Sequence, residues 1–364
     1  MDKGSYTFQA LSTKYEDFRG PAFTIKVDGT ALNSAEMPIA SLEVDLSADG
    51  SAGGCHFAVE SLYDFANSKW INNLAKTIQV GAKLEVLGGY VKQELIFYGY
   101  VEEFSMEYSG SAPPRLAVTG IDGFGYLMSF RQPIYGGKKT PQKVVEEILA
   151  KAVSAGYAKS KTVGVLSGFE TPVIKEKIDD FKYLGLLAQR YCVSLLCVAG
   201  ELIFDNVVAN SSPLITLTVG MGLLDFQKRV CLHGQVGEVE IWGKDEKQKF
   251  IKGEAKKVSI GGSGKSAAEL APKFKETAVR EFCEYVRTDK ECAELAQARL
   301  DSQALNLVSG SGTCVGIPEL IPGRYITIKG LDDSSEGTYF LSKVLHRFTE
   351  QGYYTQFEVK GAKV

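Results

Sequence analysis

The stretch Val80-Gly81-Ala82-Lys83-Leu84-Glu85-Val86 resembles a second stretch near the end of the chain, Pro322-Gly323-Arg324-Tyr325-Ile326-Thr327-Ile328, and this recurrence is the main evidence for the fold. Both stretches begin with a glycine turn and a basic residue, and both then alternate between apolar and polar side chains. Such alternation is typical of a strand with one buried face. The recurrence predicts an internal repeat, which commonly reflects a duplicated structural unit.

The surroundings of the two stretches strengthen the repeat. A long predicted strand follows each of them, at 96–104 and 339–348, and a closing strand that ends in glycine comes next, at 115–120 and 354–361. We also predict a helix before each glycine turn, at 62–74 and 291–308. Strands of this length with turn signals between them favour a barrel or a sandwich. We therefore expect residues of roughly 20–125 and 215–361 to be two copies of one β-barrel.

The middle of the chain has a different character. Residues 131–140 form a plausible boundary, and a helix is predicted from Pro141 and another from near Asp179, each with apolar residues at helical spacing. The expected fold is mainly β with an α+β insertion: two similar tube-type β-barrels plus a small α/β domain. The predicted domains are 1–130, the first barrel; 131–210, the insertion; and 211–364, the second barrel with a mobile, lysine- and glycine-rich loop at 244–266.

Composition excludes several classes of protein. The chain has 364 residues, of which 45% are hydrophobic, and its net charge is −3. This is enough apolar material for sizeable cores, and the small charge argues against a dedicated nucleic-acid binder. The seven cysteines have no framework spacing and are interpreted as reduced thiols of a cytosolic product. The start of the chain has no apolar leader, and no apolar stretch is long enough to cross a membrane.

Three short motifs resemble binding sites without completing them. Residues 261–266 look like part of a phosphate loop, but Ser259 stands where the first glycine is needed. Residues 332–337 look like the start of a calcium loop, but Lys343 stands where the loop needs its last carboxylate. Cys192 and Cys197 are five positions apart, so on a strand their side chains would point to opposite faces and could not bind one zinc ion together. We therefore predict no catalytic, cofactor-binding or metal-ligating residue, and no cofactor.

Taken together with the repeat, two segments resemble a known family. One comprises Lys177-Ile178-Asp179-Asp180-Phe181 with the following helix and the strand Gly200-Glu201-Leu202-Ile203-Phe204; the other runs from Gly316-Ile317-Pro318 through Val344-Leu345-His346 to Gly352-Tyr353-Tyr354-Thr355-Gln356-Phe357. Their order resembles the baseplate hub proteins of contractile phage tails, the phage late control D family. It is similar also to the N-terminal part of type VI secretion spike proteins.

The resemblance implies a structural protein rather than an enzyme. It implies a homotrimer whose two barrels per chain make a ring of six similar units, between a six-fold tail tube and a three-fold spike. The implied partners are the tail tube protein, a spike on a separate chain and other baseplate proteins, with tape-measure proteins as a further option. No specific nucleic acid and no membrane insertion are implied. Such a protein is made in the bacterial cytoplasm and incorporated into a virion tail or a tail-like injection particle.

Two other functions remain open at the level of sequence. One is a cell-wall- or glycan-active tail enzyme that uses a cleft of a β-barrel, and the other is a host-surface binding module of a tail. The seven lysines within 244–265 allow a solvated loop or an electrostatic contact with an acidic partner or with DNA. The duplication favours the structural role, because a ring of matched units uses duplicate barrels whereas an enzyme does not need them.

Overall fold

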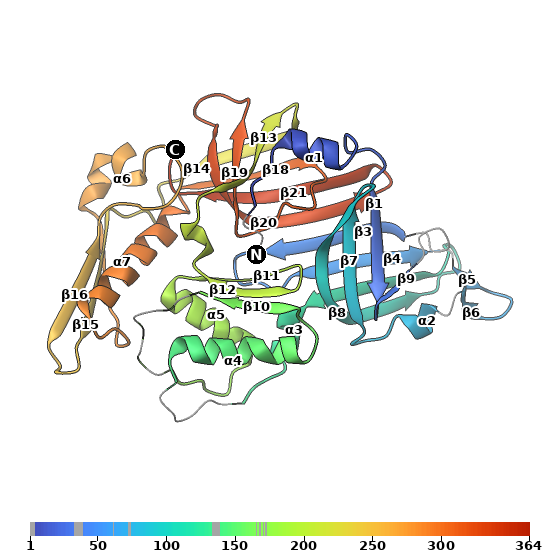
Figure 1. The fold of residues 1–364 in the computed structure, drawn as a ribbon, viewed down its shortest axis with the longest axis horizontal. Helices are drawn as coiled ribbons and strands as arrows, with labels where there is room; N and C mark the ends of the chain where they lie inside the picture. Colours follow the sequence, from blue (N-terminus) through green and yellow to red (C-terminus); the bar gives the residue numbers. More distant parts are fainter. Residues whose placement is uncertain are drawn as a thin grey trace.

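The computed structural model describes residues 4–32, 39–60, 62–71, 74–132, 139–164, 166, 169, 171 and 173–364. Strands dominate, and two barrels lie side by side with helices and small sheets against one flank (Figure 1). Among the described residues, no helix combines the length and the apolar character that a membrane crossing needs.

The first barrel is built from the N-terminal third of the chain. Its strands pair in the order β3-β4-β9-β8-β7-β1-β2, with antiparallel ladders throughout. Their bounds are β1 (Ala22–Val27), β2 (Thr30–Ala31), β3 (Ile39–Ser47), β4 (Gly54–Glu60), β7 (Lys83–Gly89), β8 (Gln93–Glu107) and β9 (Arg115–Asp122).

The second barrel uses the last third of the chain and closes on itself. Its six strands pair in the order β14-β18-β21-β20-β19-β13, and β13 returns to β14 through a short parallel contact. Their bounds are β13 (Pro213–Val219), β14 (Gly222–Val230), β18 (Val308–Val315), β19 (Tyr325–Lys329), β20 (Gly337–Thr349) and β21 (Gly352–Gly361).

The strand order confirms the predicted duplication. When the six long strands of each barrel are numbered in chain order, leaving out the two-residue strand β2, both sheets have the spatial order second, third, sixth, fifth, fourth, first. The glycine-turn strands of the repeat are β7 and β19, which therefore correspond. One difference remains: β1 runs antiparallel to β7, whereas β13 runs parallel to β19. The two barrels thus share an architecture but not the direction of one edge strand.

The predicted pair of helices is wrong in one copy. Residues 62–74 form no long helix; they contain the small hairpin β5 (Tyr63–Asp64) and β6 (Lys69–Trp70), and the short helix α2 (Leu74–Thr77) begins only at their end. The aromatic side chains that suggested a helical face instead pack on one another, with Tyr63 against both Trp70 and Tyr108. The other predicted helix is present as α7 (Asp289–Ala304), but it lies between β14 and β18 rather than directly before β19.

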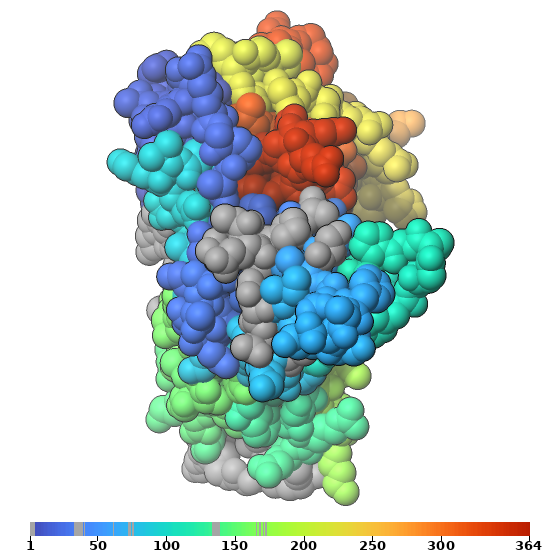
Figure 2. Space-filling view, turned by 90° about the vertical axis from the view of Figure 1, so that its right-hand side faces the viewer, coloured from blue at the N-terminus to red at the C-terminus, as the bar shows by residue number. Residues whose placement is uncertain are grey.

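A single ladder joins the two barrels. Strand β20 of the second barrel pairs antiparallel with β3 of the first, from Lys343 opposite Ser47 to Phe348 opposite Leu42. The N-terminal helix α1 (Phe8–Lys14) adds a second tie, because the ammonium group of Lys14 lies 2.7 Å from carboxylate oxygens of both Glu94 and Glu319. Figure 2 shows the C-terminal strands, in red, directly beside N-terminal segments in blue.

Aromatic rings fill the junction beneath this ladder. Phe348 stacks on Tyr353 with ring centres 3.9 Å apart, and the edge of Phe23 from the first barrel meets the Phe348 ring. Gly88 of β7 makes room for them, because a Cβ atom there would lie 2.9 Å from Cζ of Phe348 and 2.7 Å from Cδ1 of Ile96. The close approach of the barrels therefore depends on the missing side chain at Gly88.

Replacing Gly88 by valine is expected to destabilise the protein by about 1–3 kcal/mol, because the added methyl groups must displace the Phe348 ring in a filled core. Urea unfolding followed by tryptophan fluorescence measures the change. Gly110→Val is the matched control, since a Cβ at Gly110 meets no atom within 4 Å. Equal unfolding midpoints for the two variants would contradict this account of the junction.

The remaining elements form an α/β unit under the barrels. Helices α3 (Gly123–Leu127), α4 (Pro141–Ser154) and α5 (Asp180–Tyr191) pack with the sheet β10-β12-β11. The strands of that sheet are β10 (Ser160–Val163), β11 (Ser194–Val198) and β12 (Glu201–Asp205). Helices α4 and α5 begin where the sequence predicted them, at Pro141 and Asp180. The predicted boundary 131–140 falls in part outside the described residues.

The segment predicted as a mobile loop contains regular structure. Within 244–266, strand β16 (Phe250–Ala255) pairs with β15 (Glu238–Lys244), and β15 pairs with β17 (Ala278–Phe282). The prediction of a loop is therefore wrong for Phe250–Ala255. The surrounding lysines obscure the alternation of apolar and polar residues in this stretch of sequence. In the structure, Ile251 and Ala255 are buried while the charged residues between them face outward. Helix α6 (Ala267–Leu270) and the 3-10 turns η2 (Val207–Ala209) and η3 (Pro272–Glu276) complete the described elements.

The apolar core shows where this second small sheet belongs. Side chains of β15, β16 and α7 share one cluster with those of α4, α5 and β12, including Val239, Cys292, Leu149 and Phe204. The barrels share a separate cluster. The middle of the predicted domain 211–364 therefore packs with the predicted insertion 131–210, because the chain leaves the second barrel after β14 and returns to it at β18.

A buried ion pair holds the start of α5. Lys175 and Asp180 are fully buried and bonded to each other, and the Lys175 ammonium group also donates to the carbonyl oxygens of Phe130 and Gln132, at 3.2 and 3.0 Å. Lys151 of α4 contacts the second carboxylate oxygen of Asp180. One charged cluster therefore connects α4, α5 and the segment that leaves the first barrel.

Lys175→Met is expected to lower the free energy of unfolding by about 3–5 kcal/mol, because it leaves the Asp180 carboxylate buried without its main partner. The matched control is Lys139→Met, which removes a pair with Glu147 whose two side chains are about half exposed. That change is expected to cost about 0–1 kcal/mol. Chemical denaturation monitored by circular dichroism distinguishes the two, and a loss below about 1 kcal/mol for Lys175→Met would refute a structural role.

Candidate functional surface

The joined barrels share one continuous polar face. Because β20 pairs with β3, the strands β14-β18-β21-β20-β3-β4-β9-β8 form eight neighbours in which every ladder is antiparallel. One face of these strands is buried in the two barrel cores, and most side chains of the other face are exposed or half-buried. A sheet that alternates in this way presents its polar face to solvent or to a partner.

Rows of side chains run across this face from one barrel to the other. One row passes through residues that stand opposite each other on successive strands: Tyr354, Arg347, Glu43, His56, Thr119 and Glu103. Ion pairs cross the junction within it, with 2.7 Å between Arg347 and Glu43 and 2.9 Å between Lys343 and Asp45. Both pairs are partly exposed, so they stabilise little and mainly balance the charge of the face.

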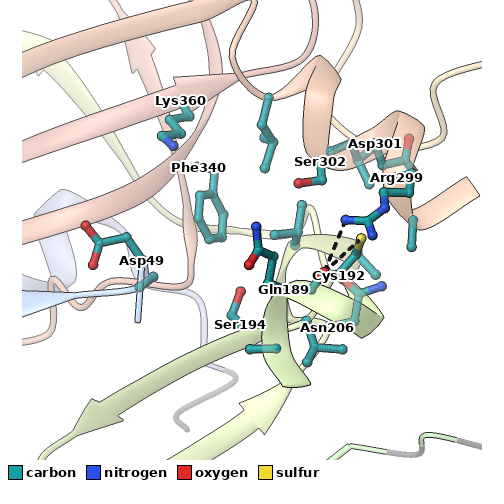
Figure 3. A pocket seen from close by; sticks show the side chains of 18 of the residues that line it. Asp49, Gln189, Cys192, Ser194, Asn206, Arg299, Asp301, Ser302, Phe340 and Lys360 are labelled. Atoms are coloured by element: carbon teal, nitrogen blue, oxygen red, sulfur yellow. Dashed lines mark hydrogen bonds between the residues drawn. The ribbon is translucent and has the colours of Figure 1, made fainter. Parts of the chain in front are cut away.

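A groove lies where the α/β unit, α7 and the second barrel meet (Figure 3), and it reaches the end of the polar face at Lys360 of β21 and Phe340 of β20. Its volume is about 860 Å³. In the groove, Arg299 donates to the carbonyl oxygen of Gln189 at 3.2 Å and pairs with Glu281, while the thiol of Cys192 lies 3.8 Å from the same carbonyl oxygen. Burial raises the pKa of the Cys192 thiol, so it is a weak nucleophile. These contacts tie α5 to α7.

The incomplete motifs of the sequence occupy structural positions. Ser266, the last residue of the phosphate-loop lookalike, caps α6 together with Glu269. The calcium-loop lookalike is a turn between β19 and β20, in which Asp332 accepts from the amide of Ser334 and Glu336 accepts from the amide of Gly330. The seven thiols are free, and five of them are buried.

One group of three glutamates and one buried aspartate were not singled out in the sequence. Glu238, Glu240 and Glu254 come close enough to hold an ion together, because β15 and β16 pair there. Lys252, Lys256 and Arg280 pair with them, so cations of the chain already occupy the group. Asp122 is buried where β9 ends, and it accepts from the amides of Gly53 and Phe124. Burial raises the pKa of Asp122 to about 7.

His346 lies inside the second barrel at the ladder that joins the barrels. It stands opposite Val44 of β3, is fully buried, and its Nδ1 lies 2.8 Å from the hydroxyl oxygen of Tyr353. Burial lowers the pKa of His346 to about 4, because the apolar surroundings disfavour the charged ring. The junction therefore contains a histidine that stays neutral in the folded protein.

We expect the protein to lose stability as the pH falls from about 6.5 to about 4. The unfolded chain binds a proton at His346 near pH 6.5, whereas the folded chain resists it until about pH 4. Between pH 7.5 and pH 5 the loss from this residue should be about 2 kcal/mol. Urea unfolding at both values should show a smaller loss for His346→Gln. The exposed His56, changed to Gln, is the control, and an unchanged pH dependence in His346→Gln would contradict the assignment.

Residues 20–350 match the family model of the Alg8 N-terminal domain, so the chain belongs to that family. The description of the family states no activity. No curated protein matches the chain by sequence.

Solved structures share the fold. The prophage MuSo2 43 kDa tail protein from Shewanella oneidensis has 14% identity and a TM-score of 0.64, over 93% of this chain and 98% of that one. The tail protein from Neisseria meningitidis MC58 has 14% identity and a TM-score of 0.62, over 94% and 96%. The E. coli c3393 protein, described as a component of the type VI secretion system similar to the T4 tail proteins gp27 and gp5, has 13% identity and a TM-score of 0.54, over 93% and 76%. The mainly β, two-barrel architecture is therefore that of phage tail proteins.

Proposed function

We propose that this protein is a structural baseplate hub of a contractile phage tail or a related contractile injection system, of the late control D type. The observation that carries the proposal is the joining of two barrels of equal strand order into one eight-stranded sheet with a polar face. Three chains would then present six similar barrels around an axis. Such a ring matches a six-fold tail tube on one side and a three-fold spike on the other.

The shared polar face gives this ring its inner wall. Acidic and basic side chains pair across the junction on this face, as Arg347 does with Glu43 and Lys343 with Asp45. A wall of balanced charge would let cargo pass without binding it tightly, because no large field of one sign attracts it. The α/β unit lies against the flank of the barrels (Figure 1) and would stand outside the wall.

The fold shared with tail proteins supports the proposal. The description of the E. coli relative places that protein in a type VI secretion system. For this chain we propose a homotrimer that contacts a tail tube protein, a spike on a separate chain and other baseplate proteins. We propose that it is made in the bacterial cytoplasm and incorporated into the particle. We also propose that the barrels lie within residues 1–130 and 211–364, and that the α/β domain 131–210 between them is extended by residues 238–304.

Light scattering coupled to size-exclusion chromatography tests the ring. We expect a mass three times the 39.6 kDa of the chain at high protein concentration or with a spike protein present, because duplicate barrels close a ring with three chains. Negative-stain images of that fraction should show rings with a central hole. A dimer that stays stable across the whole concentration range, or a monomer at every concentration with and without a spike protein, would rule out the proposed assembly.

A further inference from the structure

A second pocket lies where the strands β15 and β16, the short helix α6 and the end of the chain after β21 come together, and these elements are seen at the left of Figure 1. Its volume is about 530 Å³. Stretches that are far apart in the sequence line it, and they contribute four lysines: Lys256, Lys257, Lys275 and Lys363. The proposed ring makes no use of this pocket.

The two carboxylates that line the pocket already have partners within the chain. Glu238 lies 3.2 Å from the ammonium group of Lys256, which also pairs with Glu254. Glu269 accepts hydrogen bonds from the amide and the hydroxyl group of Ser266, at 2.7 and 2.9 Å. These acidic groups therefore serve the fold, and one lysine of the four is balanced by them.

The other three lysines keep an uncompensated charge. Lys257, Lys275 and Lys363 form no ion pair within the part of the chain that the structure describes. Their charge is felt inside the pocket: the pKa of Glu269 is lowered first by its bonds to Ser266 and further by the nearby charges of Lys363 and Lys257. The pocket therefore has a positive field, although the whole chain has a net charge of only −3.

The phosphate-loop lookalike at 261–266 lines part of this pocket, but its backbone does not cradle an anion. A phosphate loop binds through free backbone amides. Here the amide of Lys265 donates to the main-chain oxygen of Val364 at 2.7 Å, and the amide of Ser266 donates to Glu269. Because these two amides are occupied, the pocket meets an anion with the ammonium groups of its lysines.

The kind of cation favours carboxylates on a flexible chain over a phosphate group. Planar recognition of phosphate commonly uses the rigid fork of arginine, and none of the described residues that line this pocket is an arginine. Lysine is a point charge on a flexible stem, so it adapts to carboxylates at varied spacing. Val258 and Ala268 add a small apolar surface against which the methylene groups of a glutamate can pack.

We propose that this pocket binds an acidic segment of a partner protein, in which neighbouring glutamates or aspartates place their carboxylates against Lys257, Lys275 and Lys363. The positive field and the three unpaired ammonium groups match such a segment in charge. The site stands apart from the ring, because none of these lysines lies on a strand of the eight-stranded sheet. It therefore adds a contact that the barrels do not supply.

Fluorescence anisotropy of a labelled hexaglutamate peptide, titrated with the full-length protein, tests the site. We expect saturable binding that the double variant Lys257→Gln/Lys363→Gln weakens by about tenfold or more, because it removes two of the three unpaired charges. Lys257→Arg/Lys363→Arg should retain binding, since it keeps the charge. All these side chains are exposed or half-buried, so the variants should fold, which circular dichroism checks.

The matched control is Lys247→Gln/Lys249→Gln. It removes two positive charges from the same lysine-rich segment, but at the turn between β15 and β16 and outside the lining of the pocket. We expect it to change the affinity for hexaglutamate by less than about twofold, because exposed charges beyond a Debye length are largely screened.

Three results would overturn the site. Absence of saturable hexaglutamate binding would remove it, and an equal loss of affinity in the pocket variant and the control would show attraction to lysines in general. Competition with unlabelled inorganic tripolyphosphate tests the chemistry of the ligand. If tripolyphosphate displaces the labelled peptide at a lower concentration than unlabelled hexaglutamate does, the pocket is a phosphate site and the choice of an acidic segment is wrong.

Discussion

The ladder between β3 and β20 is the contact on which the rest of the architecture depends. Each barrel would be a separate small domain without it, with an open edge on its side of the junction. Six residue pairs, from Lys343 opposite Ser47 to Phe348 opposite Leu42, join the two barrels into one sheet. The backbone hydrogen bonds of this ladder fix the relative position of the barrels more firmly than side-chain contacts could. The aromatic cluster around Phe348 and the ties from Lys14 to both barrels then fill and cover a junction whose geometry the ladder has already set.

A shared sheet also explains why two barrels of equal strand order can differ in sequence. Their inward residues need only fill a core, whereas their outward residues form a common polar surface on which charges balance between barrels. Glu43 of the first barrel pairs with Arg347 of the second, so each barrel would leave a charged side chain of this pair without its partner if the barrels were apart. The closing strands differ for a similar reason: β13 runs parallel to β19 and seals the second barrel, while β1 runs antiparallel to β7 and lies at the edge of the first.

Particular elements show how far sequence patterns could be interpreted. The glycine-turn strands and the helices at Pro141 and Asp180 follow local rules, namely alternation, capping and helical spacing, and they were predicted correctly. Residues 62–74 were misassigned because the aromatic residues Tyr63 and Trp70 pack against each other across a hairpin and do not form one face of a helix. Strand β16 was missed because it lies within a segment rich in lysine and glycine, although its burial alternates with the period of two that defines a strand.

The strands that carry the repeat, the duplication and the mainly β class of the fold could be predicted from the sequence, because alternation within a few residues marks the strands and two stretches share the same pattern. That 238–304 shares a core with the insertion, that the barrels are joined through β3 and β20, and that β8 and β14 end the sheet with open edges became clear only from the folded chain. These facts concern which strands become neighbours. Residues such as Leu42 and Phe348 lie some three hundred positions apart, and no local pattern encodes a ladder that only the packing of whole barrels brings together.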